Sequence, residues 1–96
     1  MTSKQALLSA AALLMGVSCE SLSNDYLAPQ VPSTEIQLCQ GRRIYLTKCA
    51  RCHAPEPVLK YTRSEWDRIM PEMIEDTRLS TADAEAVIRY VRHFRP

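Results

Sequence analysis

Cys49-Ala50-Arg51-Cys52-His53 sets two thiols three positions apart and places a histidine directly after the second thiol. Cys-x-x-Cys-His is the attachment pattern for c-type haem. In that chemistry the two thiols form thioethers with the vinyl groups of the haem, and the histidine becomes the proximal ligand of the iron. We therefore expect one covalent haem c on Cys49 and Cys52, with His53 bound to the iron.

Two other interpretations of this motif remain open. A zinc site needs four ligands and would have to recruit His93 or Cys39, because the chain has no second Cys-x-x-Cys pair. A thioredoxin-like dithiol is expected where a strand meets a helix, and the sequence around Cys49 lacks that pattern. Haem attachment agrees with the motif and with the export signal described below.

Two helices are predicted beside the motif. Thr34 with Gln37 predicts an N-cap, and the apolar spacing after it predicts a helix that ends at about Lys48. Thr62 with Glu65 predicts a capping box and a second helix after the motif.

Pro71 interrupts the apolar stripe of that second helix. Proline lacks an amide donor and crowds the preceding turn, so the helix is predicted to end near Ile69 and to be followed by a kink or a new first turn that carries Met73. Ser80 predicts the N-cap of a third helix, which ends near Arg95. Because no alternating apolar run indicates a strand, the predicted class is all-α, with about three main helices.

The first and third helices are expected to cross through small and apolar side chains. Gly41 would allow the two backbones to approach closely. The expected contact faces are Leu38, Gly41 and Tyr45 on one helix and Val87, Tyr90, Val91 and Phe94 on the other. The covalent haem would add apolar surface to this thin core.

The N-terminus has the features of an export signal. Lys4 is the only charge in residues 1–18 and precedes an apolar run over residues 6–17. Gly16-Val17-Ser18-Cys19 resembles a bacterial lipoprotein cleavage site, so residues 1–18 are predicted to be a signal peptide and Cys19 to be lipidated. Glu20 favours an outer-membrane destination. We expect an exported, periplasmic, lipid-anchored protein; plain secretion is the alternative.

The remaining chain divides into a tether and one domain. Residues 19–33 are polar and contain two prolines, which predicts a flexible tether, and residues 34–96 form the expected haem domain. If Cys19 is lipidated, Cys39 is expected to be a buried thiol, with an intermolecular disulfide as the alternative; if Cys19 is unmodified, a Cys19–Cys39 disulfide becomes possible.

From about Gly41 to Tyr90 the chain resembles small single-haem bacterial cytochrome c lipoproteins of the class I cytochrome c fold. The resemblance is carried by Gly41 and Tyr45, by the Cys-x-x-Cys-His motif, and by the segment at 61–73. It implies a cytochrome c-like helical domain around one haem and a distal methionine at the position of Met73.

Three residues compete for the distal position on the iron: Met70, Met73 and His93. Met73 lies just past Pro71, whereas Met70 falls in the apolar stripe, where methionine is commonly core filler. His93 lies among arginines near the C-terminus and is expected to be solvated.

We also expect one tryptophan to help hold the haem. Trp66 would form a wall of the haem site and donate its indole N–H to a propionate, with Lys60 or Arg63 as cationic neighbours.

Ligation by both His53 and Met73 leaves no iron position for a substrate, which predicts a one-electron carrier rather than an enzyme. Such a carrier is either free-standing or the haem subunit of an exported redox enzyme. The alternative is a haem-based sensor or small-molecule-binding lipoprotein with a displaceable distal ligand.

The length and the net charge of the chain limit the classes of partner that it is expected to bind. A chain of 96 residues holds one small domain, and its net charge of +1 gives no reason to expect nucleic acid. Basic residues predominate around the haem motif. An acidic redox protein is therefore expected to dock near Lys48, Arg51 and Lys60.

Overall fold

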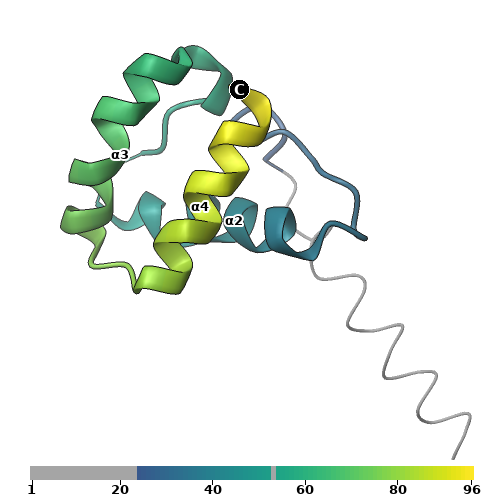
Figure 1. Cartoon of the computed structure of the whole chain (residues 1–96), viewed down its shortest axis with the longest axis horizontal. Helices are drawn as coiled ribbons and strands as arrows, with labels where there is room; N and C mark the ends of the chain where they lie inside the picture. Colours follow the sequence, from purple (N-terminus) through teal and green to yellow (C-terminus); the bar gives the residue numbers. More distant parts are fainter. Residues whose placement is uncertain (1–23, 53) are drawn as a thin grey trace, which may run out of the picture.

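The structure is a computed structural model that describes residues 24–52 and 54–96. The predicted signal peptide, Cys19 and His53 lie outside the described residues. In the described part the chain forms helices and no strand, which confirms the all-α class (Figure 1). The elements are α2 (Ile36–Thr47), the 3₁₀ turns η1 (Cys49–Arg51) and η2 (Val58–Lys60), α3 (Arg63–Thr77) and α4 (Thr81–Phe94).

The starts of α3 and α4 follow from the predicted caps. The Thr62 hydroxyl accepts a hydrogen bond from the Glu65 amide, and the Glu65 carboxylate accepts one from the Thr62 amide. Together they form a capping box. The Ser80 hydroxyl accepts the amide of Asp83 in the same way. Each cap satisfies amide groups that have no partner within the first turn of a helix.

The helix α2 begins later than predicted. Its N-cap is Glu35, which makes no side-chain cap hydrogen bond, so the cap predicted at Thr34 is not formed. Its C-terminal end agrees with the prediction, since the Lys48 amide donates to the Ile44 carbonyl as the helix closes.

The predicted end of the second helix near Ile69, with a new first turn after it, is wrong, whereas a kink at Pro71 stays a prediction. α3 continues through Pro71 to Thr77. Both Pro71 and Asp67, whose carbonyl lies one turn earlier, are exposed, so water can satisfy the carbonyl that the missing amide leaves without a partner. Met73 is therefore presented by a continuous helix.

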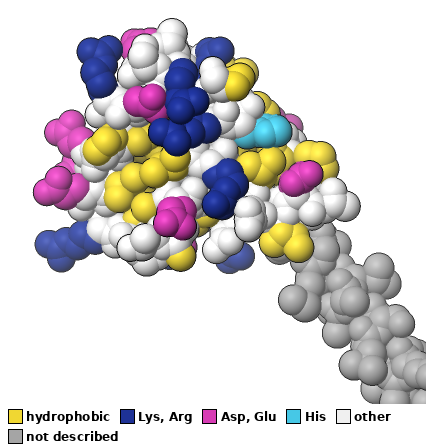
Figure 2. Space-filling model, viewed as in Figure 1, with side chains coloured by type: hydrophobic (Ala, Val, Ile, Leu, Met, Phe, Trp, Pro, Cys, Tyr) yellow, Lys and Arg dark blue, Asp and Glu magenta, His cyan; other side chains and the backbone are white. Residues whose placement is uncertain are grey.

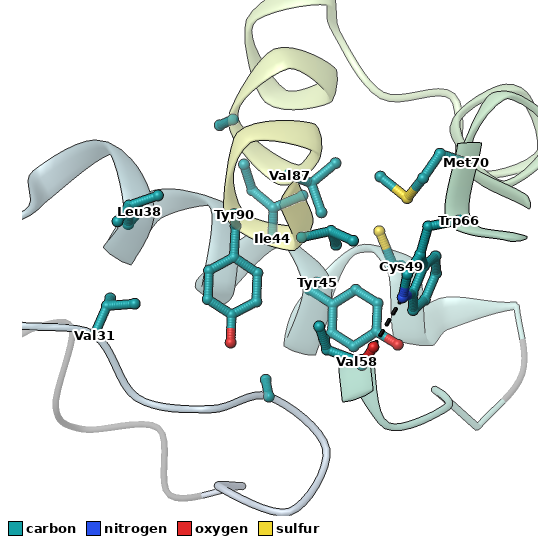
Figure 3. Packing of buried hydrophobic residues seen from close by; sticks show 13 residues of the cluster. Val31, Leu38, Ile44, Tyr45, Cys49, Val58, Trp66, Met70, Val87 and Tyr90 are labelled. Atoms are coloured by element: carbon teal, nitrogen blue, oxygen red, sulfur yellow. Dashed lines mark hydrogen bonds between the residues drawn. The ribbon is translucent and has the colours of Figure 1, made fainter. Parts of the chain in front are cut away.

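The core is built where α2 crosses α4, as the sequence predicts. A Cβ atom built on Gly41 would lie 2.6 Å from the Cβ of Tyr90 and 2.9 Å from the backbone carbon of Ala86. Real Cβ atoms do not approach other atoms so closely, so a side chain at Gly41 is excluded unless the helices separate. Leu38, Ile44, Tyr45, Val87 and Tyr90 surround this crossing (Figure 3).

The described part of the expected tether is packed against the domain. Ala28 and Val31 are buried members of the core, and the Tyr90 hydroxyl donates to the Pro29 carbonyl over 2.5 Å. The domain thus extends beyond the predicted boundary at residue 34 to include residues 24–33, which we call the N-terminal arm.

A buried arginine holds the N-terminal arm in place. Arg42 on α2 is 1% exposed, and its Nε donates to the Ala28 carbonyl over 3.1 Å. Its guanidinium also pairs with the exposed carboxylate of Asp25 over 3.4 Å. On the other side of the arm, the Val58 amide donates to the Leu27 carbonyl over 2.8 Å.

The contact between α3 and α4 is less complete than the crossing of α2 and α4. Figure 2 shows apolar side chains exposed between α3 and α4, where Met70, Pro71, Ile74 and Ile88 line a groove of about 110 Å³. Within residues 24–52 and 54–96, none of the helices has the length and apolar character needed to cross a membrane.

Candidate functional site

A cavity of about 380 Å³ lies beside the Cys-x-x-Cys-His motif. Cys49 and Trp66 in its lining are buried, whereas Glu72 and Asp76 are exposed, so the cavity runs from the core to the surface. Its volume lies in the range of about 300–1,000 Å³ that is typical of ligand sites. It is lined by Tyr45, Cys49, Pro55, Glu56, Tyr61, Trp66, Ile69, Glu72, Met73 and Asp76.

Cys49 supplies a thiol at the inner end of this cavity. It opens η1 directly after α2 and is 3% exposed, and it belongs to the same buried cluster as Trp66 (Figure 3). Burial raises the pKa of the Cys49 thiol to about 11. The folded chain thus holds this thiol protonated at neutral pH.

Cys52 supplies the second thiol near the cavity rim. It is a free, exposed cysteine, and its Sγ lies 3.9 Å from the backbone carbonyl oxygen of Asp76, a cavity-lining residue. The two thiols of the motif are therefore both reduced and both close to one cavity. His53, the expected proximal ligand, lies outside the described residues.

Of the three candidates for the distal position, Met73 is the one that lines the cavity. Residues 69, 72, 73 and 76 recur at helical spacing and place one face of α3 along it. Met70 is 5% exposed in the core and lines the groove between α3 and α4 instead. His93 is exposed on α4, with its ring against Phe94.

Trp66 forms a wall of the cavity, but its indole N–H is already used. Nε1 donates to the Val58 carbonyl over 2.8 Å (Figure 3), so the indole N–H has a partner within the chain, and its donation to a propionate stays a prediction. The expected cationic neighbours are also paired, Lys60 with Glu56 and Arg63 with Asp67.

Two aromatic residues, Tyr45 and Trp66, fix the loop that follows the motif through hydrogen bonds to its backbone carbonyls. The Tyr45 hydroxyl donates to the Glu56 carbonyl, and the Trp66 indole N–H donates to the carbonyl of Val58, two residues further on. Burial raises the pKa of Tyr45 well above its usual value, so the phenol remains a donor. Tyr61 packs edge-on against Trp66 with ring centroids 5.2 Å apart. These contacts give one side of the cavity a fixed wall.

The cavity rim is more acidic than the sequence suggests. Glu56, Glu72 and Asp76 line it, and no lysine or arginine among the described residues does. Lys48 pairs with Asp83 over 2.5 Å, and Lys60 pairs with Glu56 over 2.9 Å. Arg51 donates to the backbone carbonyls of Lys48 and Thr77. The basic residues near the motif are therefore largely engaged in contacts within the chain.

Cys39 differs from the expected buried thiol. It is half-buried and disulfide-bonded, and its partner lies outside the described residues, because Cys49 and Cys52 are free. Among the described residues, no three His, Cys, Asp or Glu side chains are grouped so that they could hold a metal ion. The zinc alternative thus has no ligand group in that part of the chain.

Several residues of the site were missed by sequence reasoning. Tyr61 and Ile69 line the cavity, as do the carboxylates of Glu72 and Asp76. The helical spacing of residues 69, 72, 73 and 76 could have indicated that these side chains share a face with Met73. Their approach to Cys49 depends on the tertiary packing of α3.

Comparison of the chain with protein-family models, curated proteins and solved structures finds no match of any of the three kinds.

Proposed function

We propose that the chain is an exported one-electron carrier with one covalent haem c, attached through Cys49 and Cys52 and ligated by His53 and Met73. The observation that carries this proposal is the gathering of Cys49 and Met73, from separate elements, in the lining of one cavity, with Cys52 near its rim. A haem supplies a reversible one-electron couple when it is bound.

The types of residue that line the cavity are those that a haem site requires. Two reduced thiols are required for attachment, and both motif cysteines are free. A flat aromatic macrocycle needs apolar walls, which Trp66, Tyr61 and Ile69 provide. A thioether on the facing helix supplies a ligand, and the exposed carboxylates at the rim leave one side of the cavity accessible to a redox partner.

Each residue has a defined task in this proposal. Cys49 and Cys52 would fix the cofactor to the chain, and His53 and Met73 would hold its iron. Trp66 and Tyr61 exclude water from the inner face of the site. Iron held by two protein side chains would supply a one-electron couple and would leave no place for a substrate, which favours electron transfer over catalysis.

The second candidate is a sensor or small-molecule-binding lipoprotein in which the distal ligand is displaced. Prompt, stoichiometric binding of carbon monoxide by the reduced protein would favour the sensor. A carrier with Met73 held by a continuous, capped helix should bind carbon monoxide slowly or not at all.

The proposed partner is a redox protein that docks near Lys48, Arg51 and Lys60 through an acidic surface. Because Lys48 and Lys60 are both paired with carboxylates, the attraction they exert is weaker than their number suggests. Electron-transfer rates that respond neither to ionic strength nor to Lys48→Glu would remove this part of the proposal.

Anchoring through a lipid on Cys19 completes the proposal, with the outer membrane as the expected location. A lipidated cysteine is a thioether and cannot also form a disulfide. The chain has four cysteines, and because Cys49 and Cys52 are free, the disulfide of Cys39 leaves only Cys19 as a partner within the chain, which counts against the lipid and favours plain secretion. Intact mass of the mature protein tests this directly: a diacyl or triacyl increment on Cys19 excludes a Cys19–Cys39 bridge.

The distal ligand is tested by the sulfur-to-iron charge-transfer band of the oxidised protein. Met73→Leu should abolish this band, lower the reduction potential and open the iron to carbon monoxide. Met70→Leu is the matched control, since it removes a methionine three positions earlier that lies outside the cavity lining. His93→Gln should also leave the band in place. Survival of the band in Met73→Leu would contradict the assignment.

A further inference from the structure

Two successive carbonyls of the N-terminal arm are bonded to two different parts of the core. The guanidinium of the buried Arg42 donates to the Ala28 carbonyl over 3.1 Å, and the Leu27 carbonyl accepts the Val58 amide over 2.8 Å. Ala28 and Val58 are both 0% exposed. Because a buried polar group that loses its partner destabilises the fold, the arm and Val58 can only move together.

Val58 connects the arm to the wall of the cavity. Its amide is bonded to the arm, and its carbonyl accepts the indole N–H of Trp66 over 2.8 Å (Figure 3). Glu56 and Pro55, which line the cavity, lie two and three residues before Val58 in the same loop. A displacement of Val58 therefore acts on the cavity through Trp66 and through this loop.

The arm acts on the cavity only through these bonds. Neither Arg42 nor any residue of the arm lines the cavity. Hydrogen bonds in series strengthen one another in a buried environment, and a fully bonded network fixes the positions of its members. The bonds from Arg42 to the arm, from Val58 to the arm and from Trp66 to Val58 form such a series.

We propose that Arg42 is a positioning residue of the haem site: by fixing the arm against Val58 it sets the place of Trp66 and so keeps water from the inner wall of the cavity. The inference rests on the haem of the proposed function and adds a residue that controls the properties of that site. It gives the N-terminal arm a role in tuning the site, beyond the stability that the packing of the arm contributes.

The expected consequence is a change in reduction potential. Solvent exposure is one of the factors that set the potential of a haem. Oxidation adds one positive charge to the site, and contact with water stabilises a charge. A cavity wall that admits water should therefore favour the oxidised form and lower the potential.

The first measurement is the ratio of oxidised to reduced exported protein at one fixed potential. Arg42→Met should raise this ratio about fivefold, because the arm is released and water reaches the wall. Arg43→Met removes the same charge from an exposed position one residue later, and it should change the ratio less than about twofold.

A neutral variant separates the position of the arm from the charge of Arg42. The Tyr90 hydroxyl donates to the Pro29 carbonyl over 2.5 Å, so Tyr90→Phe loosens the arm without a change of charge. It should raise the ratio in the same direction, by about twofold. Tyr26→Phe, which changes a tyrosine that is 83% exposed, is its control and should leave the ratio unchanged.

The second measurement follows the indole itself. Trp66 is the only tryptophan of the chain, so its indole N–H gives a single NMR signal. In the reduced protein this N–H should exchange with solvent about tenfold faster in Arg42→Met and at the same rate in Arg43→Met. Val87→Ala weakens the crossing of α2 and α4 through an apolar side chain that makes no hydrogen bond to the arm, and it should have a smaller effect.

The outcomes separate the positioning role from the haem proposal. Covalent haem is read independently from the pyridine haemochrome spectrum of the same samples, and its absence from the wild-type protein would overturn the proposed function and this inference with it. With the haem present, a changed ratio in Arg42→Met alone would be the effect of the lost charge and would overturn the positioning role. Equal indole exchange in Arg42→Met and Val87→Ala would also overturn it, because the arm would then act on stability alone. If Arg42→Met does not fold, Tyr90→Phe decides by the same two measurements.

Discussion

The two sides of this small domain are completed in different ways. Where α2 crosses α4, the chain fills the space itself, and Gly41 lets the helices approach without room for a methyl group. Where η1 faces α3, the chain encloses a cavity of about 380 Å³ instead. The difference indicates that the crossing carries more of the stability of the chain alone, whereas the cavity side leaves a space that the proposed haem would fill.

The largest effect is expected at the crossing. Gly41→Ala forces a Cβ against the Ala86 backbone and should destabilise the domain by about 3 kcal/mol or more, because neither backbone can move aside cheaply. Urea unfolding followed by helical circular dichroism measures this. The neighbouring, exposed Gln40→Ala is the control and should change stability by less than about 0.5 kcal/mol. A Gly41→Ala protein of normal stability would contradict the packing described here.

The second-largest effect on stability is expected from a change that releases the N-terminal arm. Arg42→Met removes the donor to the Ala28 carbonyl and should cost about 2 kcal/mol, because a buried carbonyl loses its partner. Amide exchange of Val58, whose N–H is held by Leu27, should become faster. Arg43→Met changes an exposed arginine one position later, so it should neither reduce stability nor speed the amide exchange of Val58. Equal behaviour of the two variants would mean that the arm does not depend on Arg42.

The two thiols of the cavity side should differ in reactivity. In the reduced apoprotein near neutral pH, iodoacetamide should modify exposed Cys52 at least about tenfold faster than Cys49, which is buried and has a raised pKa. Mass spectrometry of digests gives both rates, and unfolding in urea should abolish the difference. Equal rates in the folded protein would show that Cys49 is not buried.

The raised pKa of the Cys49 thiol predicts that the haem-free protein loses stability at alkaline pH. Its folded pKa is raised from 9.0 to about 11, so the protonated thiol stabilises the fold below pH 9. This contribution declines as pH rises from about 9 to 11. A Cys49→Ser variant compared with wild type across this range isolates the effect, and an identical pH dependence of the two proteins would refute it.

The smallest effect is expected at the start of α3. Thr62→Ala removes the capping box and should cost about 1 kcal/mol, whereas Ser64→Ala in the same turn should cost less. Backbone and side-chain hydrogen bonds from Thr62 lower the pKa of Glu65, so the cap stabilises the fold at neutral pH and is weakened as Glu65 becomes protonated in acid. Thermal unfolding at neutral and acidic pH checks both statements.

The elements that could be predicted from the sequence are those that depend on nearby residues. The caps at Thr62 and Ser80 need a hydroxyl and a partner three positions away, and both form as expected. Gly41 was identified because a small residue on an apolar helix face indicates close packing. The continuation of α3 through Pro71 could not be foreseen, because it depends on the exposure of that side of the helix.

The N-terminal arm and the shape of the cavity are tertiary features. Residues 24–33 have the composition of a linker, yet a buried arginine on α2 binds their backbone. Likewise, the motif and Met73 were identified in the sequence, but the use of the Trp66 indole by Val58 depends on how the intervening loop folds back. Sequence periodicity carries no information on such contacts between separate segments.

The central claim is that the cavity side is completed by a covalently attached haem, and a pyridine haemochrome spectrum of the exported protein tests it most directly. The account predicts a thioether-type spectrum that persists after acid-acetone extraction of loosely bound haem, and that is lost in the Cys49→Ala/Cys52→Ala variant. An exported, folded protein without covalent haem, or a double variant that retains it, would contradict the account.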